Sequence, residues 1–200
     1  MTEQYFTREP TAESRPVAAD FSYRGHTLRL MTDSGVFSRG SVDEGSALLL
    51  DSLPALSGSV LDLGCGAGVI GICAAKANDI HLTQSDVNLR ALELTRENQK
   101  SNGVTGAVVE SDGFSALAGT FDFILTNPPI RAGKAVIYRL FREARDHLAE
   151  GGALYLVIRK QQGAESAKKY LETLFERVEL VERKKGYWVL RAAGPLKGAE

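Results

Sequence analysis

Two short segments of the chain carry residue types that could do chemistry. The first, residues 60–71, places the carboxylate of Asp62 before closely spaced glycines. Such a turn lets a ligand lie directly on backbone, because glycine has no Cβ to block close approach. The second, Asn127-Pro128-Pro129, places a side-chain amide after an apolar segment. Open α/β sheets bind ligands at the carboxyl ends of their strands, so the pair predicts a nucleoside cofactor beside a planar nitrogen substrate.

The glycine spacing does not by itself identify the cofactor. Gly66-x-Gly68-x-x-Gly71 also satisfies the dinucleotide fingerprint, which is a weak signal alone. Asp62 argues against a dinucleotide, since a carboxylate at this position would repel a pyrophosphate. It suits a cofactor that carries an ammonium and a sulfonium. The alternative interpretation is a strand-to-helix turn with a capping Asp and no ligand.

A second carboxylate, Asp86, stands at the end of the expected strand 80–85. A carboxylate at this place in an α/β sheet is suited to gripping ribose hydroxyls. The alternative is that Asp86 serves as the N-cap of the helix that follows.

These motifs resemble those of a known family. Residues 61–71 are similar to motif I of class I S-adenosylmethionine-dependent methyltransferases, and Asn127-Pro128-Pro129 resembles motif IV of those that methylate exocyclic amino nitrogens. Tyr5-Phe6 and residues 32–38 resemble the small methyltransferase domain related to the guanine-N2 methyltransferases of small-subunit ribosomal RNA. The similarity runs from about residue 5 to about residue 192.

The resemblance implies S-adenosyl-L-methionine as cofactor, lying over the glycine turn with Asp86 on its ribose. It also implies that Asp112 faces the adenine; the alternative for Asp112 is a turn residue before Gly113. The implied cofactor-binding residues are Asp62, Gly64, Gly66, Gly68, Asp86 and Asp112.

For the reacting side, the carbonyl oxygens of the Asn127 side chain and the Pro128 backbone would each accept one hydrogen of the target amine. Pro128 and Pro129 stiffen the turn, so the expected contribution is orientation and electrostatics. The family pattern usually has a base-stacking aromatic after the second proline, and this chain has Ile130 instead. Phe37 is a candidate for the stacking face, or a hydrophobic plug over the rim of the sheet.

Charge is distributed unevenly along the chain. Residues 1–130 carry 9 Lys and Arg against 16 Asp and Glu, whereas residues 131–200 carry 15 against 9. Arg131 and Lys134 open the basic part, directly after the Asn-Pro-Pro turn, and Arg159 and Lys160 follow a later strand. A cationic rim would attract RNA phosphates. The alternative is that these charges are solvated helix faces.

Composition is that of an ordinary globular protein, with 44% hydrophobic and 24% charged residues. No apolar run of membrane-spanning length and no signal pattern is seen, so we expect a cytoplasmic protein. Cys65 and Cys73 lack metal or redox spacing and the three histidines are isolated, so no metal site is expected.

Alternating strands and helices predict an α/β, Rossmann-like class I methyltransferase fold. We expect a mostly parallel seven-stranded sheet with an antiparallel edge strand, helices on both faces and an N-terminal β-hairpin. Predicted strands are 60–63, 80–85, 107–110, 121–126, 153–158, 178–182 and 187–191. Predicted helices are Ser41 to about Leu53, 69–77, 88–101, 133–148 and 164–175. The expected division is an arm, hairpin and cofactor-covering loop at 1–45, the core at 46–193, and a loose tail at 194–200.

The leading functional prediction is methyl transfer to guanine N2 in ribosomal RNA. One alternative is a protein-glutamine amide methyltransferase, against which Ile130 and the basic C-terminal part count mildly. Another is a noncatalytic RNA-binding or assembly domain, against which the intact motifs count. A dinucleotide-dependent oxidoreductase is disfavoured by Asp62 and by the lack of an evident acid or base for hydride transfer.

Overall fold

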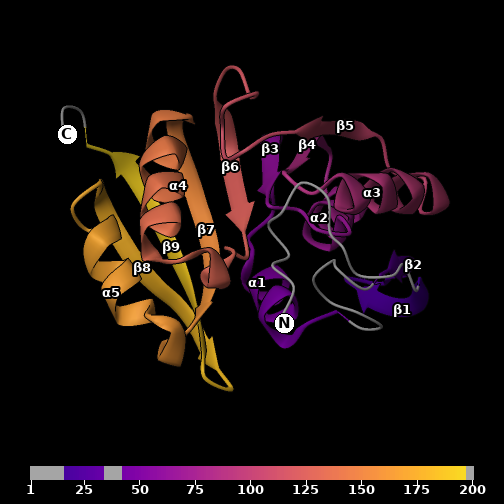
Figure 1. Cartoon of the computed structure of the whole chain (residues 1–200), viewed down its shortest axis with the longest axis horizontal. Helices are drawn as coiled ribbons and strands as arrows, with labels where there is room; N and C mark the ends of the chain where they lie inside the picture. The colour runs from indigo at the N-terminus through magenta and orange to yellow at the C-terminus, as the bar shows by residue number, and fades with distance from the viewer. Residues whose placement is uncertain (1–15, 34–41, 197–200) are drawn as a thin grey trace.

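The fold is a seven-stranded sheet with helices on both faces and a separate two-stranded hairpin, as a computed structural model of residues 16–33 and 42–196 describes it (Figure 1). The strand order is β5-β4-β3-β6-β7-β9-β8; β9 runs antiparallel to both β7 and β8, and the other pairs are parallel. The predicted fold class is confirmed. The strands are β3 Gly58–Leu63, β4 Ile80–Asp86, β5 Gly106–Glu110, β6 Phe121–Thr126, β7 Leu148–Arg159, β8 Phe175–Lys184 and β9 Tyr187–Pro195.

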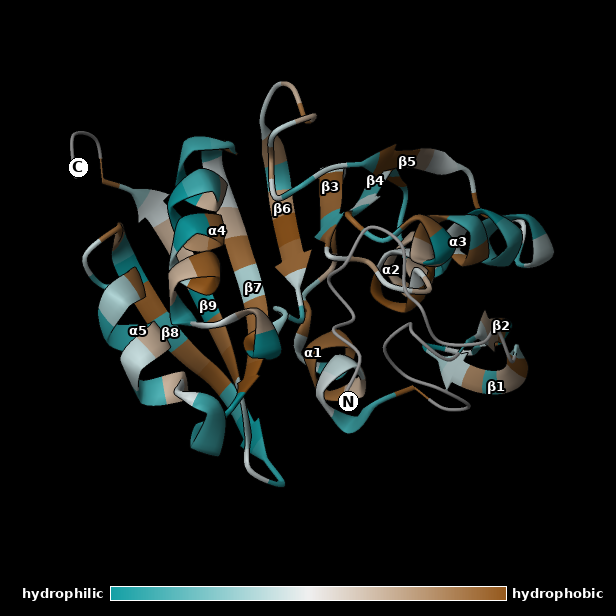
Figure 2. Ribbon diagram, viewed as in Figure 1, coloured by the Kyte–Doolittle hydropathy of each residue, from teal (hydrophilic) through white to brown (hydrophobic). Residues whose placement is uncertain are grey.

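Helices cover both faces of the sheet because its central strands are apolar on both sides. In β7, Leu154 and Leu156 pack in the cluster under α4 and α5, whereas Tyr155 and Val157 pack in the cluster with α1 and α2. Figure 2 shows the resulting apolar strands between polar outer helix faces. The helices are α1 Glu44–Ser52, α2 Val69–Ala77, α3 Leu89–Ser101, α4 Lys134–Asp146 and α5 Ala164–Leu171, with short 3-10 turns η1 Ile130–Ala132 and η2 Lys160–Gln162.

The N-terminal hairpin, β1 Val17–Tyr23 and β2 His26–Thr32, is fastened to α3 by Asn98 and to its C-cap by Asn102, which bonds the Arg29 backbone. Asn98 accepts from the Met31 backbone nitrogen at 2.7 Å and donates to the Met31 carbonyl at 2.8 Å. It also donates to the carbonyl of Ala67, inside the glycine turn, at 2.8 Å. Hairpin, helix and turn are therefore held together by one buried side chain.

The start of α1 differs from the prediction. Its N-cap is Asp43, whose carboxylate accepts from the backbone nitrogens of Gly45 and Ser46. Ser41, which begins the predicted helix and whose hydroxyl would be its N-cap, lies outside the described residues. A carboxylate and a hydroxyl are both good caps, so local sequence did not choose between them.

The ends of α4 and α5 also differ. The predicted helix end at residue 148 and strand start at residue 153 are wrong, since α4 ends at Asp146 and β7 already begins at Leu148. A Cβ at Gly152 would lie 2.9 Å from the carbonyl oxygen of Asp122, so this glycine permits close strand approach. Similarly, α5 ends at Leu171, before the predicted end, and β8 and β9 are longer than predicted. Charged side chains on the exposed edge strand β8 masked its apolar alternation.

Candidate active site

A cavity of about 820 Å³ opens at the carboxyl ends of β3, β4, β5 and β6. It brings together two segments that are about 60 residues apart in sequence, the glycine turn after β3 and the Asn-Pro-Pro turn after β6. The predicted site residues that line it are Gly64, Gly66, Asp86, Asp112, Asn127, Pro128, Pro129, Ile130 and Arg131. The lining does not include Asp62, Gly68 or Lys134, and Phe37 lies outside the described residues.

The glycine turn is left-handed at Gly64, Gly66 and Gly68, with φ of 69°, 57° and 84°. Residues that carry a Cβ rarely adopt this left-handed backbone conformation, which explains why glycine stands at these three positions. At Gly68 the packing beneath also requires glycine, since a Cβ would lie 3.0 Å from Ile72 and Thr95 side-chain atoms. The turn thus exposes backbone to the cavity on one side and seals the core on the other.

Asp62 lies beneath the turn and is fully buried. Its Oδ2 accepts from the Gly71 backbone nitrogen at 2.8 Å and from Gln84 Nε2 at 2.9 Å. Burial raises the pKa of this carboxyl to about 6, and the hydrogen bonds from Gln84 and Gly71 oppose the rise. These contacts order the turn and the start of α2; direct contact of Asp62 with a cofactor stays a prediction.

Asp86 lines the cavity and joins the glycine turn to the start of α3. One carboxylate oxygen accepts from the Gly66 backbone nitrogen and the other from that of Asn88, each at 2.9 Å. Burial raises the pKa of Asp86, and backbone hydrogen bonds oppose that rise. The N-cap of α3 is Asn88, so the interpretation of Asp86 as the helix cap is wrong. Asp86 is half-buried and lines the cavity.

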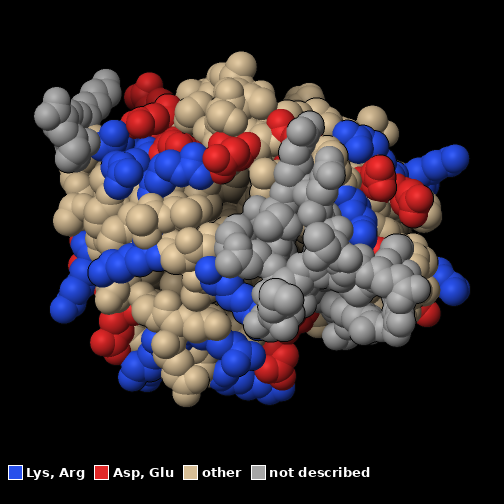
Figure 3. Space-filling view, viewed as in Figure 1, with Lys and Arg blue, Asp and Glu red and all other residues tan. Residues whose placement is uncertain are grey.

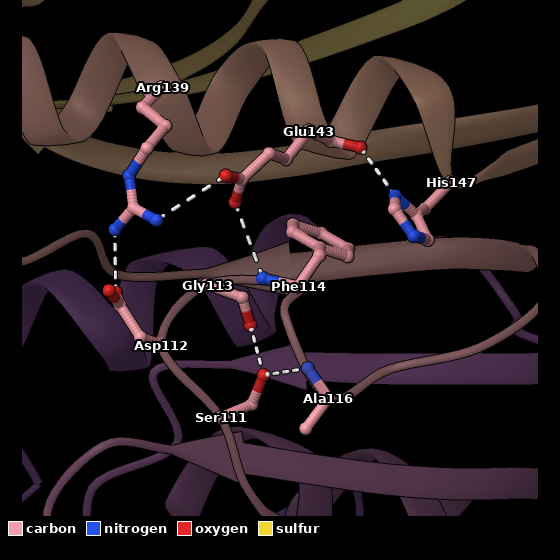
Figure 4. A network of polar contacts seen from close by, with 8 residues as sticks. All are labelled: Ser111, Asp112, Gly113, Phe114, Ala116, Arg139, Glu143 and His147. Atoms are coloured by element: carbon pink, nitrogen blue, oxygen red, sulfur yellow. Dashed lines mark hydrogen bonds and ion pairs between the residues drawn. The ribbon is translucent and has the colours of Figure 1, made fainter.

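Asp112 is held by a polar network that joins the loop after β5 to α4 (Figure 4). Arg139 donates to the Asp112 carboxylate at 2.6 Å and to Glu143 at 3.4 Å. Glu143 in turn accepts from the Phe114 backbone nitrogen at 3.3 Å. The network fixes the loop against α4, and Asp112 and Arg139 both line the cavity.

The Asn-Pro-Pro turn lines the cavity and leads from the end of β6 to η1 and α4. Strand β6 ends at Thr126, whose hydroxyl donates to the Leu63 carbonyl at 2.8 Å and so joins the two strand ends. Asn127 donates its Nδ2 to Ser46 Oγ at 3.1 Å and to Asp43 Oδ1 at 3.3 Å. The Asn127 amide oxygen, on the other branch of the planar group, takes part in neither of these two hydrogen bonds. Pro129 caps the short turn η1.

No metal site accompanies these groups in the part of the chain that the structure describes: no cluster of three or more His, Cys, Asp or Glu side chains could hold an ion. Within the same residues, no helix combines the length and apolar character needed to span a membrane.

The observation that decides the family is a match over most of the chain. A family model for the methyltransferase small domain matches residues 27–191. The chain belongs to this family. It is therefore a methyltransferase, as predicted from the two motifs.

Individual relatives agree with this assignment. A Bacillus subtilis protein, "uncharacterized protein YbxB", is 45% identical over 200 residues, which cover 96% of this chain and 98% of that protein. "Ribosomal RNA small subunit methyltransferase C" of Vibrio cholerae serotype O1 is 44% identical over 140 residues, covering 68% of this chain and 41% of that enzyme. This methyltransferase thus spans less than half the length of the Vibrio enzyme.

A solved structure has the same fold. It is the T. thermophilus 16S rRNA N2 G1207 methyltransferase RsmC in complex with AdoMet and guanosine, with a TM-score of 0.81 and 26% identity. The match covers 92% of this chain and 51% of that one. AdoMet is S-adenosylmethionine, the cofactor predicted from motif I.

Sequence reasoning missed several cavity residues of this methyltransferase. Asp43 and Ser46 come from α1, and Tyr187 comes from the start of β9. The Arg159 guanidinium lies 4.6 Å from the centre of the Tyr187 ring. These residues are distant from both motifs in sequence, and only the α1 N-cap pattern could have drawn attention to one of them.

Proposed function

We propose that this protein transfers the methyl group of S-adenosylmethionine to the exocyclic N2 of guanine in ribosomal RNA. The observation that carries the proposal is that Asn127, the glycine turn and Asp86 line one cavity. The Vibrio and T. thermophilus enzymes named above supply the substrate class.

The residues present fit the cofactor. The turn offers left-handed backbone, and a Cβ at Gly64 would meet nothing within 4 Å, so this part of the turn is open. Asp86 offers a half-buried carboxylate for the ribose hydroxyls, and Asp112 an acceptor for the adenine amine. When bound, the cofactor supplies an electrophilic methyl group on a sulfonium.

The protein's own groups act on the target amine. A guanine amino group conjugates with its ring and is a poor nucleophile. The Asn127 amide oxygen and the Pro128 carbonyl would each accept one amino hydrogen, drawing the nitrogen toward tetrahedral geometry and aiming its lone pair. Fixed acceptors of this kind also stabilise the positive charge that develops on the nitrogen.

Replacing Asp86 with Ala should weaken S-adenosylmethionine binding by about 1–3 kcal/mol, through lost charge-assisted hydrogen bonds. Calorimetry measures this directly. The matched control is Asp79→Ala, an exposed carboxylate just before the other end of the same strand, which should bind normally. Equal affinity of both variants would remove Asp86 from the ribose site.

The proposed RNA surface lies beside the cavity. Arg131 lines the cavity, and Lys134, at the start of α4, lies with its Nζ 5.0 Å from the Tyr138 ring centre. Figure 3 shows basic side chains on the side of the molecule that carries α4 and α5, with acidic side chains among them. Arg159, also at the cavity, would extend the same rim.

Charge reversal of both Arg131 and Lys134 to Glu should reduce RNA affinity and flatten its salt dependence. Each lost phosphate contact changes the slope of log affinity against log salt by about 0.7 for a single strand. Filter binding at several salt concentrations measures the slope, while S-adenosylmethionine affinity should not change. The control is the double reversal of the exposed Arg96 and Lys100 on α3. Identical slopes for wild type and Arg131/Lys134 variants would place RNA elsewhere.

The direct test is transfer of a tritiated methyl group from the cofactor into fractionated ribosomal RNA, followed by nucleoside analysis. We expect label in small-subunit RNA as N2-methylguanosine. Label in protein glutamine would replace this proposal with the amide alternative, and binding of RNA without transfer would favour a noncatalytic domain.

A further inference from the structure

The N-cap of α1 does more than close a helix. Asp43 Oδ1 accepts from the Gly45 and Ser46 backbone nitrogens, each at 3.0 Å, as a helix cap does. The same oxygen accepts from Asn127 Nδ2 at 3.3 Å, a contact that capping does not need. Asp43, Ser46 and Asn127 all line the cavity.

Two acceptors on α1 therefore meet the two hydrogens of one amide nitrogen. Ser46 Oγ lies 3.1 Å from Asn127 Nδ2, beside the Asp43 contact. If the amide were turned over, its oxygen would face the Asp43 carboxylate, and two acceptors would oppose each other. Asp43 and Ser46 thus set the orientation of the Asn127 amide, so that its nitrogen faces α1 and its oxygen faces away from α1.

The position of α1 is itself secured. A Cβ at Gly45 would lie 2.8 Å from Cε1 of Tyr187, so the ring packs directly on the first turn of the helix. Glu44 forms an ion pair with Lys185 at 2.6 Å in the β8–β9 turn. The acceptors for Asn127 are held by β9 and its turn as well as by their own helix.

We propose that Asp43 is a positioning residue for methyl transfer: it orients Asn127 and, by its negative charge, strengthens the Asn127 oxygen as an acceptor. The proposal rests on the transfer to an amino nitrogen described above. A carboxylate that accepts from one end of an amide polarises it and increases the negative charge on its oxygen. That oxygen would then stabilise the amine better as its nitrogen becomes positive.

Substitutions at Asp43 separate capping from positioning. Ser caps a helix about as well as Asp, but its shorter side chain would not reach Asn127 while capping. Asp43→Ser should therefore keep the thermal midpoint and S-adenosylmethionine affinity while lowering kcat about 10- to 100-fold, by analogy with the loss of a hydrogen-bond partner that orients a metal ligand. Asp43→Asn keeps a neutral acceptor and should recover part of kcat. Ser46→Ala should lower kcat with the same pattern.

The matched control is Asp51→Asn, which removes an exposed carboxylate from the last part of α1, outside this cavity. It should behave as wild type. Wild-type kcat in Asp43→Ser would overturn the proposal. So would a loss of kcat matched by losses of cofactor affinity and thermal midpoint, because that pattern indicates a general disturbance of the fold and not lost orientation of Asn127.

A second measurement needs no substrate. NMR of protein labelled with ¹⁵N-asparagine, with the Asn127 signal assigned by its loss in Asn127→Ala, reports exchange of the side-chain amide protons. We expect exchange about fivefold faster in Asp43→Ser than in wild type, the factor that corresponds to losing a hydrogen bond worth about 1 kcal/mol. Unchanged exchange would overturn the positioning role. If wild type methylates no RNA, the proposed function fails, while this measurement still decides the contact.

Discussion

Asn127→Ala should retain cofactor binding and lose methyl transfer by about 10²–10³-fold in kcat, the usual cost of removing one preorganised polar contact to the reacting group. Asn127 lines the same cavity as Asp86, and its proposed role is only to orient the amine. Single-turnover transfer measures the chemical step, and calorimetry measures cofactor affinity.

The decisive comparison is between the rate of methyl transfer and the affinity for the cofactor in this variant. Lost transfer with normal cofactor affinity and a normal thermal midpoint fits a role on the substrate side. A variant that turns over at nearly the wild-type rate would exclude Asn127 from the mechanism. Parallel loss of cofactor binding would instead indicate that the Asn-Pro-Pro turn shapes the whole cavity.

The second large effect concerns stability and pH. Burial raises the pKa of Asp62 from 3.8 to about 6, so the folded protein holds this proton at pH values where the unfolded chain has lost it. The free energy of unfolding should therefore fall as pH rises from about 4 to about 6 and then level off. A shift of about 2 pKa units corresponds to about 3 kcal/mol.

Asp62→Asn should remove most of that decline, because an amide oxygen can still accept from Gly71 and Gln84 but does not titrate. Denaturant unfolding of both proteins from pH 4 to pH 7 measures the difference. The pKa of Asp86 is raised by burial as well, so a smaller decline of the same sign should remain in the variant. Superimposable pH curves for the two proteins would show that Asp62 ionises normally.

Much of the fold was predictable because its signals are local. Helix α2 and strand β6 have the predicted bounds, since both are apolar runs bounded by turn-forming residues, Gly68 and Asn78 for α2 and Gly119 and Asn127 for β6. Boundaries failed where nonlocal contacts decided them. Gly152 lies within β7 because it allows β7 to approach β6, whereas its sequence context reads as a helix end.

The candidate site divides in the same way. Local residue patterns predicted the glycine turn and the amide-proline turn, and parallel strands whose carboxyl ends share one edge bring the two turns together. The sequence could not show which of the two carboxylates, Asp62 or Asp86, lines the cavity. Only the tertiary structure placed Asp62 under the turn and Asp86 at the cavity, because that choice depends on which side of each strand end faces the core.

The contacts around Asn127 were also decided only by the tertiary structure. Asp43 and Asn127 are 84 residues apart, and Tyr187 lies beyond both, on β9. Sequence patterns report periodicity and punctuation within one element. Which helix cap reaches which strand end depends on how α1 packs against β9 and its turn, and that packing is a property of the whole folded chain.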